Sequence, residues 1–137
     1  MSHISNALLT VEEKGWLEAL LEGASEETAK LVSQQINSAA VLRESARGFR
    51  SIMFDVPDDV EEIPPFKHEP VLLDMFVEDE LSSKYPVDFL IHVKNGKLVE
   101  LEVYNVGGDV LPRCLSLQNR TVRDYSHLPV CHGIDET

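Results

Sequence analysis

The chain of 137 residues has few cysteines and no long apolar segment. Its two cysteines, Cys114 and Cys131, are too few for the disulfide framework that holds small secreted domains together. No run of about 18 apolar residues occurs, so we expect no membrane-spanning helix. Residues 1–10 also lack the basic segment and apolar core of a secretory signal. These absences predict a cytoplasmic protein with reduced cysteines.

Basic residues are half as frequent as acidic ones. The sequence has 12 Lys and Arg against 24 Asp and Glu, which gives a formal net charge of −12 at pH 7. Nucleic acids and anionic membranes are bound mainly through Lys and Arg, so we expect neither to be a direct ligand. The acidity can serve solubility alone, or it can attract a basic protein partner.

Motifs for catalysis and cofactor binding are also absent. The sequence contains no phosphate-binding loop, dinucleotide fingerprint, nucleophile elbow or zinc-protease motif. His127, Cys131 and His132, with Cys114 upstream, offer ligand atoms for zinc but lack the paired short spacings of structural zinc sites. No motif around either cysteine pairs it with a histidine as a nucleophile. We therefore predict no catalytic residue, no metal and no cofactor.

Helical patterns are present near the N-terminus. Thr10 and Glu13 form a capping-box pattern before apolar residues at helical spacing, which predicts a helix over 11–22. Ser25 precedes two acids and a second periodic pattern, which predicts a helix that ends near Asn37. Each helix would have one apolar stripe that must pack against another layer.

Strand patterns follow the helices. The neighbourhood of Val41 and residues 49–56 predict two strands, and residues 71–77 predict a third that is apolar at nearly every position. Residues 57–65 contain three prolines and four acids, which predicts a surface loop.

The pattern over residues 87–104 predicts a β-hairpin, because two alternating segments flank an Asn-Gly pair. A two-residue loop would set Ile91 opposite Glu100 and place acids on the apolar face. A three-residue loop over 94–96, with its glycine in the left-handed conformation of a bulge, would set Ile91 opposite Val99 instead. We predict the second register. The opposite face of the hairpin would then carry Asp88, Leu90, His92, Leu98, Glu100, Glu102 and Tyr104.

These patterns together predict an α+β fold in which two N-terminal helices pack on a mainly antiparallel sheet of about five strands. A length of 137 residues suits a single domain over residues 1–137. Apolar and polar residues alternate poorly over 113–137, so we expect a loosely packed C-terminal tail.

Acidic residues gather in the loop at 57–65, after the strand at 71–77 and along the hairpin. Clusters of this kind are either solvated surface or a docking surface that steers a basic partner and anchors it with aromatic side chains. For the second interpretation, the predicted partner-binding residues are Asp74, Glu78, Asp79, Glu80, Glu100, Glu102 and Tyr104.

Residues 71–104, including PVDFLIHVKNGKLVELEVY, follow an N-terminal LTVEEKGWLEALLEGA. This arrangement, over residues 9–111, resembles small bacterial proteins of unknown function and immunity proteins of polymorphic toxin systems, including contact-dependent growth inhibition. The resemblance implies a protein without enzymatic activity that neutralises one cognate toxin, usually a basic nuclease, by stoichiometric binding and occlusion. It assigns no binding residues, so those above come from the charge pattern alone.

Two other functions are compatible with the sequence. A small enzyme or ligand-binding domain would have a pocket between hairpin and helices, lined by His92 with Glu100 or Glu102. A structural homo-oligomer would instead join through an edge strand. For the immunity protein, we expect a monomer or a weak dimer when the partner is absent.

Overall fold

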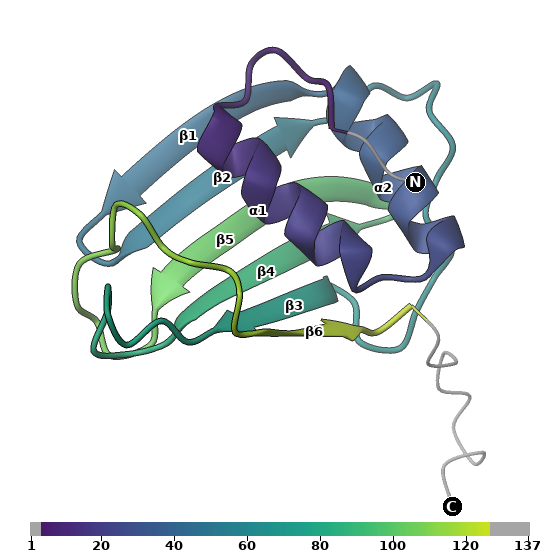
Figure 1. Ribbon diagram of the computed structural model, residues 1–137. Helices are drawn as coiled ribbons and strands as arrows, with labels where there is room; N and C mark the ends of the chain where they lie inside the picture. The colour runs from purple at the N-terminus through teal and green to yellow at the C-terminus, as the bar shows by residue number, and fades with distance from the viewer. Residues whose placement is uncertain (1–3, 127–137) are drawn as a thin grey trace, which may run out of the picture.

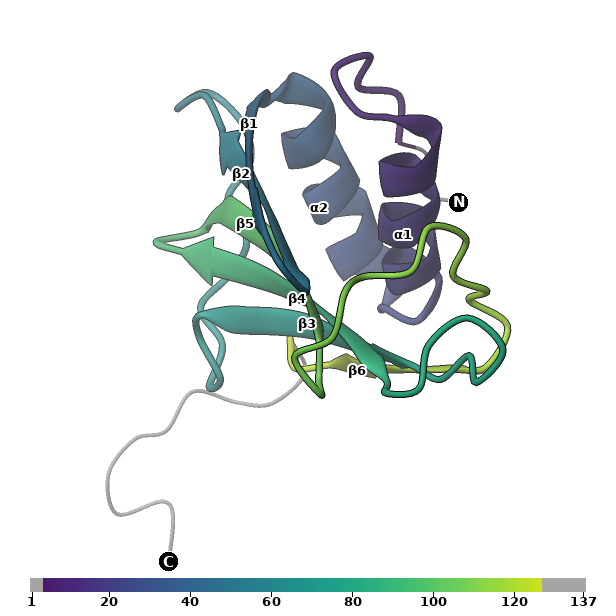
Figure 2. The same ribbon diagram turned by 90° about the vertical axis from the view of Figure 1, so that its left-hand side faces the viewer.

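The computed structural model describes residues 4–126, which form two helices and one six-stranded sheet (Figure 1). The elements in chain order are α1 (Val11–Glu22), α2 (Glu26–Ser38), β1 (Ala40–Ala46), β2 (Phe49–Asp55), β3 (Val71–Val77), β4 (Val87–Lys94), β5 (Lys97–Asn105) and β6 (Arg120–Asp124). Both helices lie on the same face of the sheet (Figure 2). The predicted α+β fold is confirmed, with six strands where we expected about five. Within residues 4–126, no helix is both long and apolar enough to cross a membrane.

The strands are arranged in the order β1-β2-β5-β4-β3-β6, and every neighbouring pair is antiparallel. The edge strand β6 lies within the segment that we expected to be a loose tail. It pairs with β3 through Val122 and Met75, and a side chain on Gly23 would collide with Val122. The Asp124 carboxylate accepts a hydrogen bond of 2.7 Å from the backbone N–H of Ser25. Residues 127–137 of the predicted tail lie outside the described residues.

Local capping explains where the helices begin. The Thr10 hydroxyl accepts from the Glu13 N–H at 3.1 Å, and the Glu13 carboxylate accepts from the Thr10 N–H at 2.9 Å. This is the predicted capping box. Ser25 caps α2 in a similar way by accepting from the Thr28 N–H. The apolar face of α1 then packs on the sheet, where the rings of Trp16 and Phe89 lie 5.3 Å apart between centroids.

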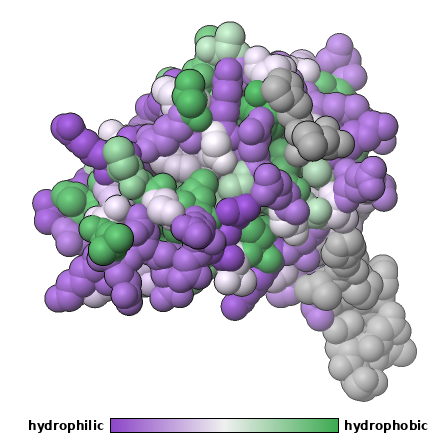
Figure 3. All heavy atoms as spheres, in the orientation of Figure 1, coloured by the Kyte–Doolittle hydropathy of each residue, from purple (hydrophilic) through white to green (hydrophobic). Residues whose placement is uncertain are grey.

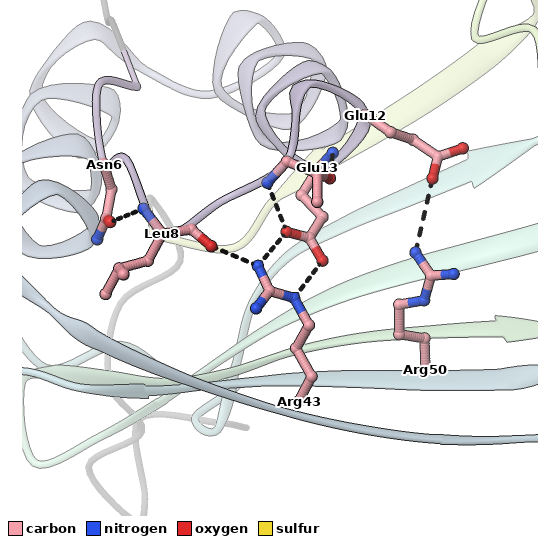
Figure 4. A network of polar contacts seen from close by, with 7 residues as sticks. Asn6, Leu8, Glu12, Glu13, Arg43 and Arg50 are labelled. Atoms are coloured by element: carbon pink, nitrogen blue, oxygen red, sulfur yellow. Dashed lines mark hydrogen bonds and ion pairs between the residues drawn. The ribbon is translucent and has the colours of Figure 1, made fainter.

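A buried ion pair fastens the start of α1 to the edge strand β1 (Figure 4). Glu13 is 1% exposed, and its two carboxylate oxygens accept from the guanidinium of Arg43 at 2.7 and 2.6 Å. The same guanidinium donates to the carbonyl of Leu8 at 2.6 Å. Burial alone would raise the pKa of Glu13, but the hydrogen bond and charge of Arg43, with the Thr10 N–H, lower it.

The hairpin register differs from our prediction. Asn95 and Gly96 have φ of 53° and 81°, so they form a two-residue turn in which Val93 pairs with Leu98. A bulge at Val99 then shifts the register by one residue. Ile91 therefore pairs with Leu101, and neither of the two registers weighed from the sequence forms.

The bulge keeps the two faces of the hairpin chemically distinct. Phe89, Ile91 and Leu101 are fully buried on the helix side. Leu98 is also buried, at 1% exposure, although we had placed it on the opposite face. The other members of the predicted polar face do share one side, because Asp88, Leu90 and His92 pair with Tyr104, Glu102 and Glu100.

Candidate functional site

The side of the sheet that faces away from the helices carries most of the candidate residues, and within residues 4–126 no helix covers it (Figure 2). Cross-strand partners project on the same side of a sheet, so the strand registers define this surface. We call it the open face. Its members include Ser51 and Met53 on β2, Asp74 and Phe76 on β3, Asp88, Leu90 and His92 on β4, Glu100, Glu102 and Tyr104 on β5, and Arg123 on β6.

A row of polar contacts crosses the middle of the open face. His92 Nε2 lies 2.9 Å from Glu102 Oε1, and both side chains are partly buried. The Ser51 hydroxyl donates to Glu100 Oε2 at 2.5 Å. These contacts fix the orientation of both glutamates, so their carboxylates are presented in a defined position.

Asp88 is the most buried carboxyl group of the open face, with 8% of the residue exposed. Tyr104 donates its hydroxyl to Asp88 Oδ2 at 3.1 Å, and the Phe89 N–H donates to Oδ1 at the same distance. Burial, followed by the hydrogen bond and charge of Asp74, raises the pKa of Asp88 to about 7. Burial and the Asp88 carboxylate also raise the pKa of Tyr104 to about 12.

Asp74 lies beside Asp88 on the neighbouring strand. Its cross-strand partners are Leu90 on β4 and Arg123 on β6, so Asp74 and Asp88 are diagonal neighbours. Among residues 4–126, Asp74 Oδ1 is a buried side-chain oxygen that receives no hydrogen bond. A buried acceptor without a donor is costly, so this oxygen marks a place where a proton is needed.

Basic and apolar side chains complete the surroundings of this acidic centre. Arg123 lies beside it on β6, whereas Lys94 and Lys97 lie at the turn end of the hairpin. Phe76 is 39% exposed and Leu90 is half-buried on the same face. The open face therefore combines carboxylates with apolar area that water contacts.

The predicted partner-binding residues do not form one cluster. Asp74, Glu100, Glu102 and Tyr104 belong to the open face. In contrast, Glu78, Asp79 and Glu80 follow β3 in a loop at one end of the sheet.

Asp79 has a structural role in that loop. It accepts from the Ser116 N–H at 2.9 Å, and this hydrogen bond is the main cause of its lowered pKa. The acidic loop at 57–65 lies at the other end of the strands, where Asp58 contacts Lys97. The acidic residues that we grouped from the sequence therefore lie in three separate regions: the open face and the two ends of the sheet.

Asp88 belongs to the site, although we did not include it among the binding residues. The alternation of the hairpin placed it on the correct face, but its partnership with Asp74 depends on the pairing of β3 with β4. No pattern in the sequence near Asp74 or Asp88 predicts the pairing of these two strands.

Comparison with known proteins does not assign a function to the open face. No family model, curated protein or solved structure matches the chain. The resemblance to immunity proteins therefore stays a prediction, and the function has to be argued from the site itself.

The pocket that we placed between hairpin and helices is not formed by His92, Glu100 and Glu102. All three residues are on the open face, away from the helices. On the helix side, polar and apolar residues are interspersed over the surface (Figure 3). A small cavity of about 160 Å³ lies there, and its wall includes Trp16 and Arg50. The Arg50 guanidinium lies 5.3 Å from the Trp16 ring centroid. It also forms an ion pair with Glu12 (Figure 4), so its positive charge already has a partner.

A metal centre has no support within residues 4–126, where no group of three or more His, Cys, Asp or Glu is arranged to hold an ion. Cys114 is exposed. The other members of the weighed zinc cluster, His127, Cys131 and His132, lie outside the described residues.

Proposed function

We propose that this chain is a binding protein whose open face docks onto a basic protein, and that it acts as an immunity protein against a cognate toxin. The observation that carries the proposal is the acidic sheet face, over which the described chain packs no helix. A sheet face of this kind is available to a partner without rearrangement of the fold.

The charge distribution supports a basic partner. Glu100 and Glu102 are held in place by Ser51 and His92 at the centre of the open face. The net charge of −12 adds a long-range field of the same sign. Such a field accelerates association with a positively charged surface and repels acidic competitors.

Apolar side chains on the same face support a stable complex. Phe76 and Leu90 lie beside the acids, and Tyr104 adds an aromatic ring with a polar tip. Aromatic and apolar side chains at the centre of an interface commonly supply most of its binding energy. The open face thus offers both steering and anchoring groups.

The choice of a toxin, and of a nuclease among toxins, follows from the resemblance and from charge. A nuclease binds its polyanionic substrate through Lys and Arg. An acidic face that occupies this basic surface would exclude the substrate by simple occlusion. This mechanism requires stoichiometric binding and no catalytic group on the immunity protein.

The test is a pull-down with the tagged protein from cells that express the product of the adjacent upstream gene, at low and high salt. We expect a basic partner bound one to one, with salt-sensitive recovery. The double variant E100K/E102K should weaken binding at least about tenfold, because two carboxylates of the open face become cations.

The matched control is D59K/E61K, which makes the same change of charge in the exposed loop at one end of the sheet. It should retain most of the binding. Equal losses in both variants would show that net charge and not the open face matters, and recovery of no partner would contradict the immunity function.

A further inference from the structure

Asp74 and Asp88 lie too close together to be two independent carboxylates. They are diagonal neighbours on adjacent strands, and the charge of Asp74 helps to raise the pKa of Asp88. An ionised carboxylate can only accept hydrogen bonds, so two ionised groups have no donor to offer one another. A proton on one of them would supply the donor that the pair lacks.

Burial points in the same direction. Asp88 is 8% exposed, and Asp74 Oδ1 is buried without a donor among the described residues. Placing two negative charges side by side in this environment is unfavourable, and one shared proton relieves both the repulsion and the missing hydrogen bond.

We infer that Asp74 and Asp88 share one proton at the centre of the open face and release it to solvent when a basic partner docks. The charge of the pair then changes from −1 to −2. The first half of this inference concerns the free protein, whereas the second half rests on the proposed function.

The charged groups around the pair oppose one another. Glu102 on β5 adds negative charge beside Tyr104, and negative charge near the pair favours its protonated form. The Tyr104 hydroxyl and, beyond Asp74, the guanidinium of Arg123 favour the ionised form. His92 lies on β4 two residues beyond Leu90, the cross-strand partner of Asp74, and it contacts Glu102.

A cation brought by a partner would shift this balance toward ionisation. The pKa of Asp88, raised to about 7 by burial and by Asp74, places the change close to neutral pH. Because the partner favours the ionised pair, its affinity should rise with pH up to about 7, by at most about tenfold per pH unit, and then level off.

The proton on the free protein can be observed by NMR titration of the aspartate carboxyl carbons. We expect one signal of the pair to titrate with a midpoint near 7. D74N should lower the Asp88 midpoint by at least about one pH unit, because it removes the neighbouring charge and supplies an N–H donor. D59N, in the exposed loop, should leave it unchanged. Midpoints below about 5 for both groups in the wild type would overturn the inference.

Proton release can be measured by calorimetry at pH 6.5 with a hexa-arginine peptide as the probe, in buffers of different ionisation enthalpy. Wild-type protein should release up to about one proton per peptide, and D88N should release none. His92 is unchanged in D88N, so a proton release that is lost in this variant comes from the aspartate pair and not from His92.

The outcomes distinguish this inference from the proposed function. If E100K/E102K abolishes peptide binding but the wild type releases no proton, the release is refuted and the docking face is retained. If E100K/E102K binds the peptide as the wild type does, the docking face is refuted, whereas a midpoint near 7 would still support the shared proton.

Discussion

Glu13 on α1 and Arg43 on β1 form a two-pronged ion pair that joins the helix layer to an edge strand, with nitrogen–oxygen distances of 2.7 and 2.6 Å. The carboxylate is almost completely buried, whereas the guanidinium is 38% exposed. The pair is thus well placed to hold α1 at a fixed position over the sheet.

Loss of the cation should destabilise the protein. Arg43→Met leaves the Glu13 carboxylate buried without its partner, and we expect the free energy of unfolding to fall by about 2–4 kcal/mol in urea denaturation. Arg47→Met is the matched control, because the pair of Arg47 with Asp109 is exposed at the surface. Its effect should stay below about 0.5 kcal/mol, and equal effects would contradict a special role for Arg43.

The same pair should make stability sensitive to acid. The pKa of Glu13 in the folded protein lies below its ordinary value of 4.5, because Arg43 outweighs the effect of burial. The stabilisation is therefore present above pH 4.5 and is lost as pH falls through the lower folded pKa. We expect the difference in unfolding free energy between wild type and Arg43→Met to shrink below pH 4. A constant difference from pH 7 to pH 3 would refute this linkage.

Asp88 should have the opposite effect on stability. Its pKa is raised in the folded protein to about 7, so the folded state holds a proton that the unfolded state releases near its ordinary value of 3.8. Stability should accordingly fall as pH rises between these values and stay lower above pH 7.

Asp88→Asn removes this cost and offers an N–H to Asp74, but its amide keeps only one of the two oxygens that accept from the Tyr104 hydroxyl and the Phe89 N–H. We therefore expect its effect on the unfolding free energy to be more favourable at pH 8 than at pH 4 by about 1–3 kcal/mol. Thermal unfolding at both pH values measures the change, with Asp59→Asn as control. A stabilisation of the same size at pH 4 would argue against a titrating pair.

The bulge at Val99 predicts how the hairpin responds to deletions. Removing Val99 leaves Leu98 on the helix side and Glu100 on the open face, because the extra residue of the bulge is lost. We expect a change of less than about 1 kcal/mol in unfolding free energy. Deleting Leu101 should cost more than about 3 kcal/mol, because Glu102 would then take a buried position. Circular dichroism and urea denaturation distinguish these results, and equal tolerance of both deletions would contradict the observed register.

Features that depend on neighbouring residues in the chain could be predicted from the sequence. Thr10 and Glu13 are three residues apart, so their mutual capping was readable from the pattern alone. The hairpin was readable for the same reason, although its register was not. That register depends on the burial of Leu98 on the helix side, which is a property of the whole sheet.

Features that depend on distant pairing could not be predicted. The segment of β6 has little apolar character of its own and becomes a strand through its ladder with β3. The contact of Asp74 with Asp88 arises in the same way from the pairing of β3 with β4. The charge pattern proposed Glu100 and Glu102 as binding residues, and both lie on the open face. It could not show that the acidic loops lie at opposite ends of the sheet.

The contact between Ser25 and Asp124 also has a consequence for how the chain acquires its structure. The two residues are separated by 99 positions, and they join the start of α2 to the end of an edge strand. During synthesis, this contact cannot form until residue 124 has left the ribosome. Contacts between residues so far apart in the sequence slow folding. We therefore expect the helices and the hairpin to form early, and β6 to complete the sheet last.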